Sequence, residues 1–126
     1  MNTSEILRTA KSILLVDWAS PEVPRSLVQA GFTVFCASPG RYSVVELSET
    51  GSPDFRRLNE SPSHVDIVNV FRPENEHEGI VAHYVLPLGA KVLWLQPSIG
   101  SGTARRLSLE HGFDLVEGVD IAGAVR

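Results

Sequence analysis

Three times along this sequence, a helix-like stretch ends at a glycine and an apolar, strand-like run begins within two residues. The glycines are Gly31, Gly89 and Gly112. A glycine just past a helix can adopt the left-handed conformation that closes the last turn. Repeated alternation of helix and strand places the strands in a parallel sheet with helices on its faces. We therefore expect a three-layer α/β fold, with positive φ angles at two or more of these glycines.

The apolar runs predict a parallel sheet of about five strands. Runs that are apolar throughout suit strands buried on both faces. The predicted strands are Ile13–Val16, Thr33–Ala37, Val65–Val70, Val92–Leu95 and Leu115–Val116. The predicted helices are Glu5–Ala10 (capped by Ser4), Pro24–Ala30, Glu74–Leu86 and Gly102–His111 (capped by Ser101). The long connection 41–63 does not follow the alternation; in it, Ser43–Leu47 can add an edge strand and Phe55–Leu58 a helical turn.

Size and charge narrow the class of protein. A chain of 126 residues with 43% hydrophobic and 21% charged residues indicates one globular domain, 1–126. A net charge of −4 disfavours nucleic acid and anionic membranes as partners. Its one cysteine, Cys36, cannot form an internal disulfide and is expected to be buried and inert. No apolar run reaches the roughly 18 residues of a membrane span, so we expect a cytoplasmic protein.

Ligands of open parallel sheets bind beyond the carboxyl ends of the strands. That rule selects the loops Asp17–Pro24, Ser38–Tyr42, Phe71–Asn75 and Gln96–Gly102. Their Arg, Ser and Gly residues suit a phosphate, and Arg72 is expected to pair with it. The segment at Ser101 and Gly102 would add backbone N–H groups at a helix start. Trp18 either covers a base or closes the core, and Arg41 is a further candidate.

Features typical of catalysis are sparse. The four histidines are scattered and predict no metal site. No serine stands in a nucleophile elbow. The first loop has Asp17, Trp18 and Ala19 where a dinucleotide-binding protein would show glycines, which disfavours NAD. An enzyme is therefore the less favoured hypothesis.

Several stretches resemble a known family. They are Trp18-Ala19-Ser20-Pro21, Ala37-Ser38-Pro39, Val65-Asp66-Ile67-Val68-Asn69-Val70-Phe71-Arg72-Pro73 and Gly89-Ala90-Lys91-Val92-Leu93-Trp94-Leu95-Gln96. Together they resemble the small stand-alone CoA-binding domain proteins, whose Rossmann-like fold is similar to the N-terminal domain of the succinyl-CoA synthetase alpha subunit. The resemblance implies that Ser20 lies at the diphosphate loop and that Ser38 and Pro39 flank the adenosine. It also implies that Phe71, Arg72 and Gln96 line the crevice.

The resemblance implies a module that binds CoA or an acyl-CoA and has no catalytic activity of its own. In the synthetase, the chemistry uses a phosphorylated histidine in a second domain. This sequence departs from the family at Trp18, where a glycine is usual. Two alternatives therefore stay open: a Rossmann-like domain acting as a protein-interaction or regulatory subunit, and a domain binding another nucleotide such as NAD. A homodimer or another protein partner also stays open.

Overall fold

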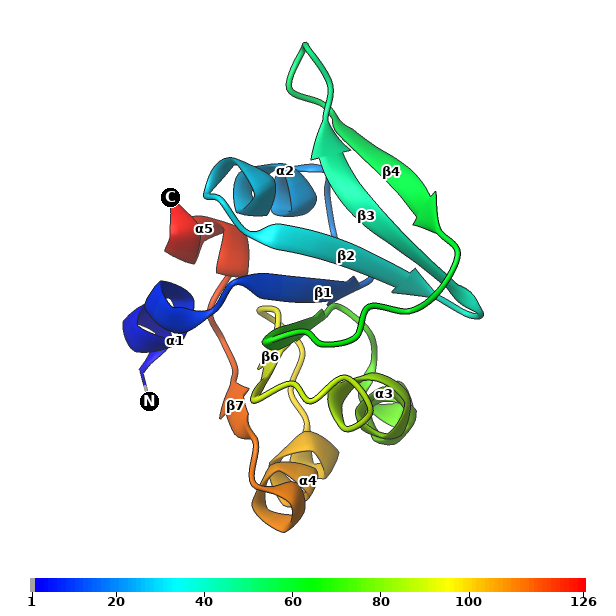
Figure 1. Ribbon diagram of the computed structural model, residues 1–126. Helices are drawn as coiled ribbons and strands as arrows, with labels where there is room; N and C mark the ends of the chain where they lie inside the picture. Colours follow the sequence, from blue (N-terminus) through cyan, green and yellow to red (C-terminus); the bar gives the residue numbers. More distant parts are fainter. Residues whose placement is uncertain (1) are drawn as a thin grey trace.

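A computed structural model describes residues 2–126 as a sheet between two layers of helices (Figure 1). In chain order the elements are α1 (Thr3–Thr9), β1 (Ser12–Val16), α2 (Glu22–Gln29), β2 (Thr33–Ser38), β3 (Arg41–Leu47), β4 (Pro53–Leu58), β5 (Ile67–Val70), η1 (Glu74–Glu76), α3 (His77–Ile80), η2 (Val81–Val85), β6 (Val92–Leu95), α4 (Gly102–His111), β7 (Asp114–Val116) and α5 (Ile121–Val125). The expected three-layer Rossmann-like α/β fold is confirmed.

The sheet has seven strands in the order β4-β3-β2-β1-β5-β6-β7. The strands β2, β1, β5, β6 and β7 are parallel and match the five predicted from apolar runs. The antiparallel hairpin β3–β4 extends this sheet and projects beyond α2 (Figure 1). The helical turn predicted at Phe55–Leu58 is wrong, because these residues pair with β3 as the edge strand β4.

Each face of the sheet has its own apolar core, because the buried strands are apolar on both sides. Leu14, Val68 and Leu93 face the side covered by α3, η2 and α4. Ile67 and Trp94 face the side covered by α1, α2 and α5. The Trp94 indole is fully buried and donates a hydrogen bond to the Val119 carbonyl at 2.8 Å. Its role as a core residue is therefore confirmed.

The helices follow the prediction more loosely than the strands. The segment predicted as one helix, Glu74–Leu86, divides into a 3-10 turn, a short α-helix and a π-helix. The first helix is capped by the Asn2 side chain and not by Ser4. All three predicted glycines have positive φ angles, between 67° and 98°. None of the helices described in residues 2–126 is long and apolar enough to cross a membrane.

Candidate functional site

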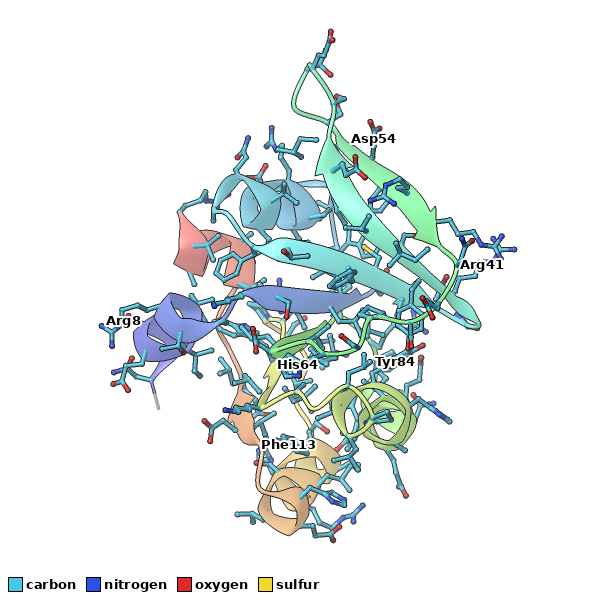
Figure 2. All side chains as sticks on the ribbon, in the orientation of Figure 1. Arg8, Arg41, Asp54, His64, Tyr84 and Phe113 are labelled. Carbon is cyan, nitrogen blue, oxygen red and sulfur yellow. The ribbon has the colours of Figure 1, made fainter. Side chains whose placement is uncertain are left out.

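The carboxyl ends of β1, β2 and β5 meet around one pocket at the edge of the sheet. We call it the Arg72 pocket; its volume is about 370 Å³. It is lined by Val16, Asp17, Trp18, Ala37, Ser38, Pro39, Arg72, Glu76, Ile80 and Tyr84. Tyr84 comes from η2, packs edge-to-face on Tyr42, and lies between that helical segment and the β2–β3 hairpin (Figure 2). Four sequence-predicted site residues are thus brought together here: Trp18, Ser38, Pro39 and Arg72.

A second pocket, of about 280 Å³, also lies beyond the carboxyl ends of the parallel strands. We call it the Gln96 pocket; it is lined by Ala19, Ser20, Val23, Phe71, Gln96, Pro97 and Asp120. Consecutive residues of the first loop, Trp18 and Ala19, line the two pockets in turn. The predicted residues Ser20, Phe71 and Gln96 therefore lie together, next to the group around Arg72.

A polar chain runs from the Gln96 pocket into the sheet. Gln96 donates to the Asp120 carboxylate at 3.0 Å and accepts from the backbone N–H of Ile121 at 3.0 Å. These two bonds fix its amide, so its oxygen also accepts from the buried Asn69 amide at 3.2 Å. The Asn69 oxygen has no partner among the described residues. The orientation of the Gln96 amide is thus fixed by hydrogen bonds.

The guanidinium of Arg72 is already paired with two carboxylates. Its Nε donates to both Glu76 oxygens, at 3.0 and 3.1 Å, and its Nη1 donates to Asp17 Oδ2 at 3.1 Å. The hydrogen bonds with Glu76 and Asp17 raise the pKa of Arg72. In return, the hydrogen bonds from Arg72 hold the pKa of Glu76 below its usual range. The formal charges of one guanidinium and two carboxylates sum to −1.

Backbone geometry holds Asp17 in place. This residue has a φ angle of 66°, which is uncommon for a residue with a side chain. Its Oδ1 accepts the N–H of Trp18 at 2.9 Å, and local bonds of this kind are what let Asp adopt the left-handed region. A strained residue that points a carboxylate at Arg72 is the sort of feature that gathers at functional sites.

The N-terminus of α4 is filled by groups of the chain itself. Ser101 accepts the N–H of Ala104 at 2.9 Å, as the predicted cap, and is 2.8 Å from His77 Nδ1. The Thr103 N–H donates to the Glu74 carboxylate at 3.0 Å. Two N–H groups at this helix start, those of Thr103 and Ala104, therefore already have partners within the chain. Ser101 is buried, and both Ser101 and Gly102 lie outside the two pockets.

Two predicted residues, Trp18 and Arg41, lie at the β3–β4 hairpin. Trp18 stacks on Phe55 of β4, with ring centroids 5.3 Å apart and an angle of 16° between the planes. Trp18 thus lines the Arg72 pocket and also closes the core beneath the hairpin. Arg41 is the first residue of β3, directly after the turn from β2, and lies exposed outside both pockets (Figure 2).

Sequence reasoning did not single out four polar pocket residues as ligand contacts: Asp17, Glu76, Tyr84 and Asp120. Of these, Glu76 carried a signal, since it stands four residues after Arg72 and such pairs meet on helical turns. The described residues contain no cluster of three or more His, Cys, Asp or Glu side chains that could hold a metal ion.

The comparisons with known proteins agree with this architecture. The sequence model of the family described as CoA binding domain matches residues 16–119. A protein from Thermus thermophilus, called cell-free ID.343, has a similar structure with a TM-score of 0.71 and 24% identity, covering 98% of this chain and 96% of that one. A hypothetical protein from Pyrococcus horikoshii OT3 has a TM-score of 0.71 and 24% identity, covering 95% and 84%. At such identities the likeness concerns the fold.

Proposed function

This chain belongs to the CoA binding domain family, and we propose on that basis that it binds CoA or an acyl-CoA as a module without catalytic activity of its own. One observation carries the proposal. The ends of β1, β2 and β5 form the Arg72 pocket, and all three lie within the residues that match the family. The carboxyl edge of a parallel sheet is where folds of this type hold their ligands.

The two pockets suit the two ends of CoA. CoA joins a phosphorylated adenosine to pantetheine through a diphosphate. The Arg72 pocket offers the Trp18 ring, the Ser38 and Tyr84 hydroxyls and one guanidinium, which suit the nucleotide end. The Gln96 pocket combines apolar side chains with three polar ones, Ser20, Gln96 and Asp120, and suits the amides and methyl groups of pantetheine. The proposed ligand therefore runs along the sheet edge from one pocket to the other.

One observation favours a second candidate function, that of a protein-interaction or regulatory subunit. The positive charge of Arg72 is compensated by Asp17 and Glu76, so the pocket offers a phosphate no unpaired cation. A domain that kept the fold and lost the nucleotide would keep such internal ion pairs. The two candidates differ in whether CoA binds at all.

Calorimetric titration with CoA, acetyl-CoA, NAD and ATP tests the proposal. We expect CoA or acetyl-CoA to bind and NAD and ATP to bind more weakly. The Arg72→Gln variant is expected to lose about tenfold in CoA affinity, because a charge-assisted hydrogen bond to phosphate is removed. Incubation with acetyl-CoA should release no free thiol if the module has no catalytic activity.

The matched control is Arg106→Gln. Arg106 lies on α4, is exposed, and pairs with Glu110 outside both pockets. It changes the net charge by the same amount and should leave CoA affinity unaltered. Absence of CoA and acetyl-CoA binding to the wild-type protein at millimolar ligand would overturn the proposal and favour the interaction subunit.

A further inference from the structure

The carboxylate of Glu76 accepts hydrogen bonds from the Nε and Nη2 edge of the Arg72 guanidinium. Besides the two bonds from Nε, the Nη2 of Arg72 donates to Glu76 Oε2 at 2.5 Å. Arginine binds phosphate in the same bidentate way. Glu76 therefore occupies the place on Arg72 that a diphosphate would use best.

The arrangement follows from the sequence around Arg72. Arg72 lies two residues after the end of β5, Pro73 follows it, and η1 begins at Glu74. Glu76 then stands four residues after Arg72, so the helical turn returns its carboxylate to the guanidinium. Asp17 reaches the other end of Arg72 from the first loop. The pair is thus built into the backbone path and does not depend on a chance surface contact.

Exposure keeps this pair exchangeable. The side chains of Arg72 and Glu76 are each 40% exposed, and both line the Arg72 pocket. Ion pairs with such access to water are weak, because water and dissolved ions compete for both partners. A ligand phosphate that enters the pocket can therefore exchange with the Glu76 carboxylate.

We propose that Glu76 is a specificity-determining residue of this site: its carboxylate competes with the ligand's phosphates for Arg72, so that a phosphate-bearing ligand must displace it. This inference rests on the proposed function, in which the ligand carries phosphates. Glu76 lowers the affinity of every ligand that binds Arg72 through an anionic group. Only a ligand with enough further contacts, such as those of the Gln96 pocket, overcomes that penalty. Small phosphate-bearing ligands without such contacts are disfavoured.

The test compares Glu76→Gln with the wild-type protein in titrations with CoA, pantetheine and inorganic pyrophosphate. Removing the competing charge should raise the affinity for CoA by about two- to fivefold, the scale of an exposed ion pair. The affinity for pyrophosphate should rise by a similar factor. Pantetheine has no phosphate, so its affinity should not change. Asp17→Asn removes the other carboxylate from Arg72 and should shift CoA affinity in the same direction.

The matched control is Glu78→Gln. Glu78 lies two residues further along, is exposed and 3.9 Å from Arg106, and lines neither pocket. Its variant makes the same change in net charge and should leave all three affinities unaltered. Urea unfolding of each variant verifies that it is folded at the titration temperature.

The outcomes separate this inference from the proposed function. If the wild type binds CoA and Glu76→Gln binds it no more tightly, the competition by Glu76 is refuted and the CoA-binding function stands. If Glu76→Gln gains affinity for pyrophosphate while no variant binds CoA, the competition stands and the CoA-binding function fails. Equal gains in affinity for Glu76→Gln and Glu78→Gln would show that the effect comes from net charge alone, which would also refute the inference.

Discussion

The Cys36 thiol lies in the core between the sheet and α2. It is 6% exposed, and burial raises its pKa to about 12. Since the thiolate is the reactive form, we expect thiol reagents to label native Cys36 far more slowly than urea-unfolded protein at pH 8. Release of a coloured thiol from an aromatic disulfide reagent measures both rates. Equal rates would show that the thiol is accessible in the folded protein.

At the same scale, the sequence predicted local backbone conformation better than charge pairing. Positive φ angles at Gly31, Gly89 and Gly112 were predictable because the end of a helix sets them locally. The charge state of the site was not predictable in this way. Arg72 meets Asp17 across 55 residues of sequence, so the fold alone brings the two together. An arginine expected to attract phosphate therefore lies between two carboxylates.

Among the elements, α4 depends most visibly on one side chain. The Ser101 hydroxyl accepts the Ala104 N–H and lies against His77 Nδ1, while His77 Nε2 is 2.8 Å from the Arg72 carbonyl. A carbonyl can only accept, so Nε2 is a donor, and in a neutral imidazole the Ser101 hydroxyl then donates to Nδ1. Ser101→Ala removes the cap and leaves a buried ring nitrogen without a donor. We expect it to lower the free energy of unfolding by about 2 kcal/mol in urea titrations.

The control for this prediction is Ser4→Ala. Ser4 was the cap that the sequence suggested for α1, but the structure gives that role to Asn2. The exposed Ser4 side chain can therefore be removed with little change in stability. A Ser4→Ala variant destabilised as much as Ser101→Ala would mean that serine removal, and not the cap, determines the result.

The elements predicted well are those with signals at both ends. The helix α4 begins after Ser101 and ends before Gly112, as expected from the cap and the glycine. The strand β4 was missed because most of its side chains are exposed and its stability comes from pairing with β3. The helix α5 is only five residues long, and its Asp120 cap accepts a hydrogen bond from Gln96, which follows the distant strand β6. Contacts of that kind leave no local pattern in the sequence.

At the scale of the whole molecule, the Asp66 side chain joins the amino ends of β1 and β5 by hydrogen bonds. Its Oδ2 accepts the N–H groups of Lys11 at 2.7 Å and Ser12 at 3.1 Å, and its Oδ1 is 2.8 Å from His64. Burial alone would raise the pKa of Asp66, but the bonds from Lys11, His64 and Ser12 together lower it. The carboxylate therefore stabilises the fold above the unfolded pKa of about 4, and that contribution is lost as the pH falls through the lower folded value.

Asp66→Asn measures this contribution. At pH 7 we expect the variant to lose about 1 kcal/mol of unfolding free energy, a figure that allows for the partial exposure of the carboxyl. Below the folded pKa of Asp66 the wild type has lost the same charge, so the difference in unfolding free energy between wild type and variant should become smaller. Urea unfolding at pH 7 and near pH 3 makes the comparison. An equal difference at both pH values would show that the lost stability does not depend on ionisation of the carboxyl group.

The position of β1 has a consequence for how the protein is made. The first strand of the chain lies in the middle of the sheet, between β2 and β5. During synthesis, the segment β1 to β4 leaves the ribosome before β5 exists, at about 5–20 residues per second. For those seconds β1, buried on both faces in the finished protein, has one unpaired edge. The nascent chain therefore passes through an aggregation-prone interval that ends only when β5 emerges, and chaperone binding is expected to matter most there.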